Sequence, residues 1–161
     1  MVKTLYRVSG KKRMSKDIQC IFFVPSLFED RLSAVEKAKA YIDNEVKLNV
    51  NKGAYKASIE GKNASAYNSH DAADTFSAII YDEIYMCLNV YPVIEYGDNN
   101  RRVFSYRGYD IVSVDTETWG IYSSDFLFGK ISKDNVEAAL QYIDHFIFEL
   151  LLQQNGEEED E

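Results

Sequence analysis

The chain has few residues of the kinds that mark disulfide frameworks, metal sites and phosphate-binding loops. Its 161 residues include two cysteines, two histidines, two prolines and eight scattered glycines. Cys20 and Cys87 belong to no Cys-x-x-Cys or Cys/His spacing, so we expect two free thiols and no zinc site. No Gly-x-Gly-x-x-Gly, Walker or calcium-loop pattern occurs. We therefore expect no cofactor and no metal.

Long apolar runs are also missing. No segment approaches the ~18 apolar residues of a membrane-spanning helix, and residues 1–7 carry charges without an apolar stretch. At 46% hydrophobic, the chain is apolar enough to fold around a core. We expect a cytoplasmic protein with one domain over residues 1–156, followed by an acidic disordered tail at 157–161.

Positive charge is scarce after residue 62. Residues 1–62 hold 13 Lys and Arg against 7 Asp and Glu, whereas residues 63–161 hold 5 against 19, so the net charges are +6 and −14. A stretch at −14 repels nucleic acid and attracts basic surfaces. This asymmetry favours an interaction role, although many acidic proteins carry such charge for solubility alone.

Hydrophobic spacing predicts an α+β fold, an antiparallel β-meander packed by about three helices. Period-two patterns with short turns between residues 93 and 131 indicate the meander, since short loops join antiparallel neighbours. The expected strands before it are residues 3–8 and 17–24, a hairpin with a basic tip, and residues 54–60. The expected helices begin near Ser33 (with Glu36 as a capping box), at Asp71 (reaching about Leu88) and at Asp134 (reaching about Gln154, with Gly156 as a stop).

Two helical segments resemble each other. Residues 35–43 (VEKAKAYID) and 136–144 (VEAALQYID) are identical at six of nine positions. Each follows extended segments, which suggests a strand–strand–helix unit used twice. Convergence of two amphipathic helices explains the match equally well.

A wider resemblance covers about a quarter of the chain. The segments 106–111 (YRGYDI), 128–130 (FGK) and 142–144 (YID) look like those of small β-meander-plus-helix proteins encoded by bacteriophages and mobile elements. The closest class in character is the phage anti-defence proteins, the anti-CRISPR and anti-restriction inhibitors. The resemblance implies a phage origin and a host-cytoplasm location, and it assigns no site residue.

Catalytic signals are weak. His70 lies between Ser69 and Asp71, but adjacent side chains point apart and cannot form a triad. His145 projects away from the core side of its helix. The Asp115-Thr116-Glu117 triplet is better explained as a solvated hairpin tip than as a metal site. We therefore expect no catalytic residue and no enzyme.

The last helix has apolar residues on two sides. Its main stripe runs from Val136 to Leu151, while Phe148 and Leu152 lie on the opposite side, near His145. Such a helix is either sandwiched in the core or docked on a partner. The twelve tyrosines agree with an interface, where tyrosine is enriched.

These features predict a non-enzymatic acidic protein that binds and inhibits a nucleic-acid-handling enzyme, such as a nuclease effector with a basic groove. Carboxylates would compete there with phosphates. One alternative is an immunity or regulatory protein that binds a toxin or forms a homodimer, and a less favoured one is a carboxylate-dependent hydrolase. We expect no direct nucleic-acid or membrane binding. The predicted partner-binding residues are Asp98, Asp110, Asp115, Glu117, Asp125, Phe148 and Leu152.

Overall fold

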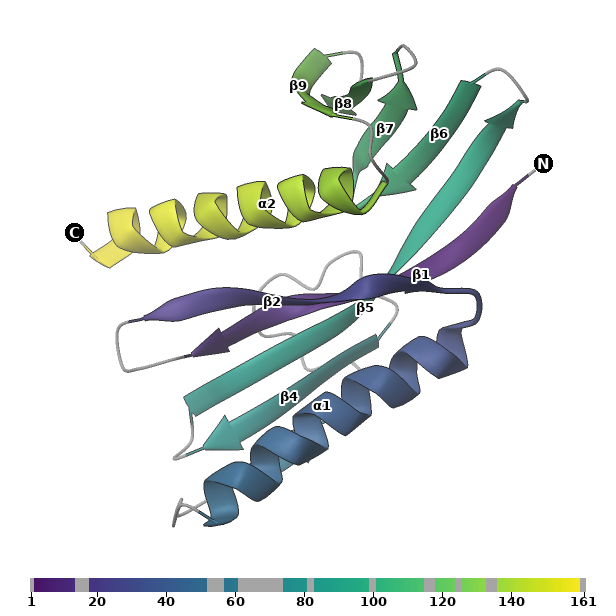
Figure 1. The fold of residues 1–161 in the computed structure, drawn as a ribbon. Helices are drawn as coiled ribbons and strands as arrows, with labels where there is room; N and C mark the ends of the chain where they lie inside the picture. Colours follow the sequence, from purple (N-terminus) through teal and green to yellow (C-terminus); the bar gives the residue numbers. More distant parts are fainter. Residues whose placement is uncertain are drawn as a thin grey trace. The chain divides into compact units, whose positions relative to one another are not determined.

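The fold class is α+β with antiparallel strand pairing, as the sequence predicts. The structure is a computed structural model that describes residues 2–13, 18–51, 57–60, 74–80, 83–98, 101–114, 118–123, 126–132 and 136–159. Within these residues the chain forms nine strands and two helices (Figure 1). In chain order they are β1 (Lys3–Arg13), β2 (Gln19–Phe28), α1 (Arg31–Asn51), β3 (Ala57–Glu60), β4 (Asp74–Ile80), β5 (Glu83–Asp98), β6 (Arg101–Tyr106), β7 (Tyr109–Ser113), β8 (Thr118–Ser123), β9 (Phe126–Ser132) and α2 (Val136–Glu159).

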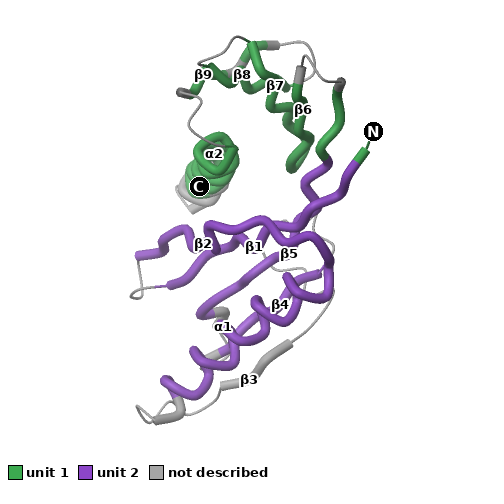
Figure 2. The backbone as a smooth tube through the Cα atoms, turned by 45° about the vertical axis from the view of Figure 1, so that its right-hand side comes forward, with its two compact units in different colours: residues 1–2, 95–161 green, residues 3–94 purple. Residues whose placement is uncertain are grey.

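The chain divides into two compact units (Figure 2). We call residues 3–94 the N-terminal unit and residues 1–2 with 95–161 the C-terminal unit. The long strand β5 contributes residues to both. The expectation of a single domain stays a prediction, because compactness by itself does not show whether two units fold separately.

The N-terminal unit is a five-stranded sheet with one long helix packed on it. Its strand order is β2-β1-β5-β4-β3. Helix α1 buries Ala34, Ala38 and Ile42 completely, four residues apart, which places them on one face of the helix. This face packs against a core that includes Val8 of β1 and Leu88 of β5. The helix expected in this segment is therefore confirmed.

Strands β1 and β5 approach closely at one glycine. A Cβ atom at Gly10 would collide with the backbone carbonyl oxygen of Cys87. Backbone atoms cannot move aside as a flexible side chain can, so this position requires glycine. The sequence pattern alone does not reveal this requirement, because it depends on a strand 77 positions away.

The C-terminal unit contains the expected meander, with β6, β7, β8 and β9 following the end of β5 in order. A two-residue turn joins β6 to β7, with positive φ angles at Arg107 (50°) and Gly108 (84°). Two consecutive positive φ angles are typical of a type I′ turn, whose twist matches that of the flanking strands. In the same unit the rings of Phe104 and Trp119 meet edge to face at 5.8 Å.

The predicted helix over residues 71–88 is wrong. Residues 74–80 form β4 and residues 83–98 form β5. The described residues therefore contain two helices and not about three. The spacing of Phe76, Ile80 and Ile84 fits a helix as well as a strand. Both faces of β4 and β5 are buried, so the alternation of apolar and polar residues that marks a strand is weak here.

Both helices differ from prediction at one end. Helix α1 begins at Arg31 rather than near Ser33, because Asp30 caps it. Helix α2 continues past Gly156, the predicted stop, as far as Glu159. A glycine within a helix costs about 1 kcal/mol relative to alanine, which weakens a helix without necessarily ending it. The last two residues lie outside the described part of the chain.

The hairpin at the start of the chain forms as predicted but is longer. Its basic residues Lys11, Lys12 and Arg13 belong to β1 and are half-buried, so they are not a solvated tip. The element order β1-β2-α1 and β8-β9-α2 is compatible with a repeated strand–strand–helix unit. The duplication itself stays a prediction.

Candidate partner-binding surface

Of the five predicted acidic residues, one has a described side chain. Asp110 lies on β7, is half-buried, and accepts a hydrogen bond of 3.1 Å from the Tyr96 hydroxyl. Burial, followed by this bond, raises the pKa of Tyr96 above its usual value. Asp98 is the last residue of β5, and nothing is described of its side chain. Asp115, Glu117 and Asp125 lie outside the described residues.

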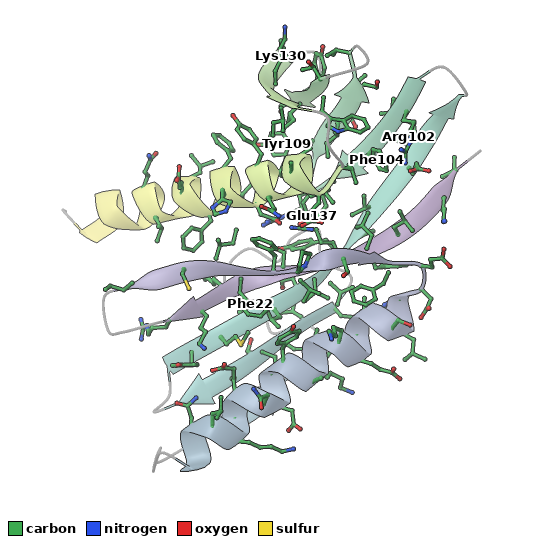
Figure 3. All side chains as sticks on the ribbon, viewed as in Figure 1. Phe22, Arg102, Phe104, Tyr109, Lys130 and Glu137 are labelled. Atoms are coloured by element: carbon green, nitrogen blue, oxygen red, sulfur yellow. The ribbon has the colours of Figure 1, made fainter. Side chains whose placement is uncertain are left out.

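Two other carboxylates of the C-terminal unit bind its own arginines. Glu95 accepts a bond of 2.7 Å from Arg102, whose side chain is labelled in Figure 3. Asp144 is fully buried and accepts bonds from the Tyr106 hydroxyl at 2.6 Å and from Arg107 Nη1 at 3.0 Å. Asp144 is therefore a structural carboxylate that is not available to a partner, whereas Glu95 is a surface carboxylate paired with a cation of its own unit. The sequence does not separate them from the candidate binding residues.

The excess of negative over positive charge still lies in one unit. The C-terminal unit contains 15 Asp and Glu but only 5 Lys and Arg, a net charge of −10. The N-terminal unit contains 11 Asp and Glu and 13 Lys and Arg, a net charge of +2. Even if each cation of the C-terminal unit paired with one carboxylate, ten carboxylates would lack a cation from that unit. The asymmetry between sequence halves is therefore an asymmetry between compact units.

Helix α2 is anchored in the C-terminal unit by contacts along its first half. Besides the bonds to Asp144, the rings of Tyr109 and Phe146 meet edge to face at 6.3 Å. A Cβ atom added at Gly129 of β9 would lie 2.9 Å from the Tyr142 hydroxyl, so the lack of a side chain at Gly129 makes room for this tyrosine. These contacts fix which side of α2 faces its unit.

The opposite side of α2 is exposed. His145, Glu149 and Leu152 are all exposed, and we call these three residues the outer stripe. Their spacing of four and three residues places them on one helix face. Leu152 is thus accessible, as a partner-binding anchor must be, whereas Phe148 is half-buried. The prediction that His145 points away from the core is confirmed.

Sequence reasoning missed a polar face in the N-terminal unit. On the side of the sheet opposite α1, Thr75 donates to Asn89 at 2.7 Å and Asn89 donates to the Tyr91 hydroxyl at 3.1 Å. All three residues are buried. Thr75, Ser77 and Asn89 alternate with apolar neighbours, but this alternation covers only short stretches of β4 and β5, so a helix also fitted the segment.

Lys11 and Cys87 lie on the same polar face. Burial is the main cause that lowers the pKa of Lys11 to about 8, and Arg13 contributes while Cys87 opposes the shift. Burial also raises the pKa of the Cys87 thiol. A thiol with a raised pKa is a poor nucleophile, because the thiolate is the reactive form. Both cysteines are free, as predicted.

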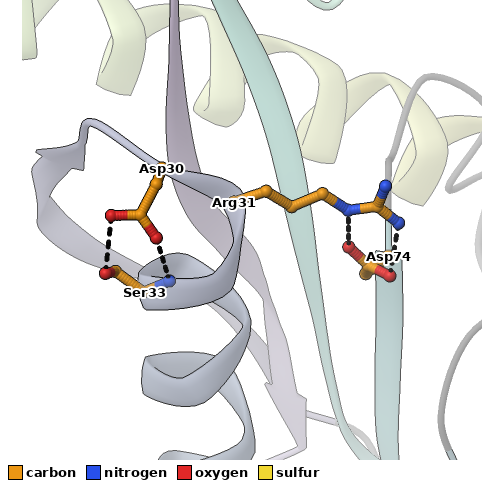
Figure 4. A network of polar contacts seen from close by, with 4 residues as sticks. All are labelled: Asp30, Arg31, Ser33 and Asp74. Carbon is orange, nitrogen blue, oxygen red and sulfur yellow. Dashed lines mark hydrogen bonds and ion pairs between the residues drawn. The ribbon is translucent and has the colours of Figure 1, made fainter.

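A polar network fixes the start of α1 (Figure 4). Asp30 accepts bonds from the Ser33 backbone N–H at 2.8 Å and from the Ser33 hydroxyl at 2.9 Å. The next residue, Arg31, donates two bonds to Asp74 of β4, at 2.7 and 2.9 Å. The capping residue is therefore Asp30 and not Ser33, and a bidentate ion pair ties the first turn of α1 to the sheet.

Within the described ranges, no three His, Cys, Asp or Glu side chains are arranged to hold a metal ion. Neither described helix is long and apolar enough to cross a membrane. His70 lies outside the described part of the chain. Comparison of the chain with protein-family models, curated proteins and solved structures gave no match.

Proposed function

We propose that this chain is a non-enzymatic acidic protein that binds a basic surface on a nucleic-acid-handling enzyme and keeps nucleic acid away from it. The observation that supports this proposal is the net charge of −10 confined to the C-terminal unit. In character the protein is a phage anti-defence inhibitor of the anti-CRISPR or anti-restriction class. Its place of action is the cytoplasm of the host cell.

The mechanism is competition for Lys and Arg side chains. A groove that binds phosphates attracts carboxylates by the same long-range field, and complementary charge speeds association. Asp98, Asp110, Asp115, Glu117 and Asp125 are the proposed acidic contacts. Because Asp110 also binds Tyr96, it contributes a partly screened charge.

The alternative of a carboxylate-dependent hydrolase has less support. Among the residues that the structure describes, the buried carboxylates are Asp74 and Asp144, which belong to different units and each bind an arginine. A general acid must lie within hydrogen-bond reach of the substrate, and these two carboxylates are buried against the chain's own arginines. The proposal therefore includes no catalytic residue, metal or cofactor.

The test is inhibition of purified nuclease effectors by the full chain. An RNA-guided nuclease and a restriction endonuclease are each assayed with increasing protein at about 50 and about 200 mM salt. We expect inhibition of at least one effector that weakens at the higher salt, because ion pairs to the basic groove are screened. Failure to inhibit or bind any effector of either class contradicts the proposal.

A charge-matched pair of variants locates the contact. The first replaces the five proposed carboxylates by their amides (Asp98→Asn, Asp110→Asn, Asp115→Asn, Glu117→Gln and Asp125→Asn). The control replaces five carboxylates of the N-terminal unit that have no proposed role in binding (Asp17→Asn, Glu29→Gln, Glu36→Gln, Asp43→Asn and Glu60→Gln). We expect the first variant to lose at least about tenfold in affinity and the control to lose little. Equal losses would mean that net charge alone matters.

A second candidate function is an immunity protein that binds a protein toxin. The outer stripe of α2 favours it, because an exposed helix face that carries Leu152 can contact a defined protein partner. Protection of cells that express a nuclease toxin, without effect on purified defence nucleases, distinguishes this function from the first.

A further inference from the structure

The meander of the C-terminal unit has two faces, and α2 packs on one of them. Ile121 of β8 and Gly129 of β9 lie opposite each other, and Tyr142 of α2 packs against Gly129. Successive residues of a strand point to opposite faces of its sheet, so Gly120 and Tyr122 face away from α2. We call the side of the meander that faces away from α2 the back face.

Three side chains converge over Gly120 on the back face. A Cβ atom added at Gly120 would lie 2.9 Å from both Val114 and Tyr122 and 3.5 Å from Leu127. Val114 is nevertheless 36% exposed and Leu127 is 40% exposed, while Tyr122 is half-buried. The lack of a side chain at Gly120 therefore makes room for an accessible cluster of one aromatic and two aliphatic side chains.

Asp110 lies on the same face between two tyrosines. It is opposite Tyr122 in the register of β7 and β8, and residues opposite each other in a sheet share a face. It also accepts the bond of 3.1 Å from the hydroxyl of Tyr96, which is 37% exposed. A carboxylate offers about four acceptor sites, so the bond from Tyr96 leaves Asp110 able to accept further donors.

Other proposed acidic contacts adjoin this face in the sequence. Three of them are within two residues of an exposed residue of the back face: Asp98 of Tyr96, Asp115 of Val114 and Asp125 of Leu127. Consecutive Cα atoms are about 3.8 Å apart. Covalent connection therefore keeps these charges near the back face.

The charge of the C-terminal unit restricts what can cover the back face. Lys130 lies on this face, opposite Gly120 (Figure 3), but the unit as a whole has a net charge of −10. A second copy of the chain would bring two such units together, and nucleic acid would add phosphates to the same charge. Like charges repel in both cases, whereas a basic protein surface is attracted.

Arginine is the basic side chain that fits the groups of the back face. Its guanidinium is planar, stacks on aromatic rings and donates paired hydrogen bonds to a carboxylate. Its methylene groups pack on apolar surface. The ammonium of lysine is a point charge without a planar face, so it uses fewer of these contacts.

We propose that the back face binds an arginine side chain from the basic surface of the partner protein. The guanidinium contacts Asp110 between the rings of Tyr96 and Tyr122. Apolar atoms beside that arginine pack on Val114 and Leu127. The inference rests on the proposed function in that the partner has a basic surface, and it goes further by naming the face and the side chain that this face recognises.

The experiment uses the full chain and two short fluorescent peptides of equal length and charge. One peptide alternates arginine with glycine, and the other alternates lysine with glycine. Fluorescence anisotropy is measured at about 150 mM salt, where long-range attraction is screened. We expect the arginine peptide to bind at least about threefold more tightly. Equal affinity for the two peptides overturns the proposal while leaving charge-driven inhibition of nucleases intact.

Two tyrosine variants test the contribution of the aromatic ring. Tyr96 and Tyr142 are each 37% exposed and belong to the same unit, but Tyr142 packs on the other face of the meander. Substitution by leucine keeps an apolar side chain and removes the ring. We expect Tyr96→Leu to weaken binding of the arginine peptide by about threefold and Tyr142→Leu to leave it unchanged. Circular dichroism checks that both variants are folded, and equal effects overturn the proposal.

Two aspartate variants test the carboxylate. Asp110→Asn and Asp43→Asn each remove one negative charge, and Asp43 lies in the N-terminal unit with its side chain 51% exposed. We expect Asp110→Asn to weaken binding of the arginine peptide by at least about fivefold and Asp43→Asn to change it little. Equal losses would mean that the peptide responds to net charge alone, and this result overturns the proposal.

Two further outcomes overturn the assignment of the back face. A dimer of the wild-type chain in sedimentation that Leu127→Asp dissociates would assign this face to a second copy. Nuclease inhibition that neither Tyr96→Leu nor Asp110→Asn weakens would place the partner contact elsewhere, and the proposed function would stand. Selective binding of the arginine peptide without inhibition of any nuclease has the opposite meaning, because the proposed function then fails while the arginine site stands.

Discussion

At the scale of single residues, sequence similarity does not predict environment. Asp43 and Asp144 occupy the same position in the two similar helical segments. Asp144 is fully buried between Tyr106 and Arg107, whereas the Asp43 side chain is 51% exposed and pairs with Lys47 at 3.1 Å. The difference comes from the strands packed against each helix, which the similarity between the helices does not include.

This pair gives a matched prediction of stability. Asp144→Asn should lower the free energy of unfolding by about 3 kcal/mol, because it removes the buried charge that partners Arg107. Asp43→Asn should lower it by about 0.5 kcal/mol or less, because exposed ion pairs contribute little. Urea denaturation of both variants measures the difference. Equal effects would show that the Asp144 cluster does not anchor α2.

At the scale of elements, helix ends depend on single hydrogen bonds. The segment 30–36 offers two possible caps, Asp30 with Ser33 and Ser33 with Glu36. The first is formed, and its two bonds from Ser33 lower the pKa of Asp30 below 3.8. A carboxylate is the stronger acceptor, and at a helix N-terminus its charge is favourable.

The cap predicts a pH-dependent effect. Asp30→Ala should lower the melting temperature by a few degrees at pH 7, and Glu36→Ala should change it little. Since the folded-state pKa of Asp30 is lowered, its stabilisation is complete above the unfolded value of 3.8 and is lost as the pH falls through the lowered pKa. Thermal melts at decreasing pH should therefore bring the variant and the wild type together. A difference that persists in acid would contradict this assignment.

Elements with one buried face were predictable, and elements with two were not. The meander from β6 to β9 and the core face of α1 follow from period-two and helical patterns. For β4 and β5, burial of both faces leaves Phe76, Ser77 and Ala78 equally hidden, so the pattern that separates strand from helix is lost. Tertiary packing decided those two elements.

At the scale of the whole molecule, charge is the dominant property. The net charge is −8, and the surplus is confined to one compact unit. Like charges at this density repel one another and oppose compaction. The same charge that would attract a basic partner therefore costs the free protein some stability.

This trade-off predicts opposite effects of salt on stability and on binding. Raising NaCl from about 20 to about 300 mM shortens the screening length severalfold. We expect the melting temperature of the free protein to rise and its affinity for a basic partner to fall. Calorimetry and the inhibition assay measure the two effects. A melting temperature that falls with salt would mean that attractive ion pairs, such as Arg31–Asp74, outweigh the repulsion.

The sequence by itself determined composition-level properties and local patterns: the α+β class, the meander, the free thiols and the concentration of acidic residues after position 62. These depend on charge, spacing and residue type, which a sequence states directly. Only the tertiary structure decided which carboxylates bind the chain's own arginines, why Gly10 must be glycine and which side of α2 is exposed. Each of these depends on contacts between residues that are far apart in the sequence, and no local sequence pattern shows which distant residues come into contact.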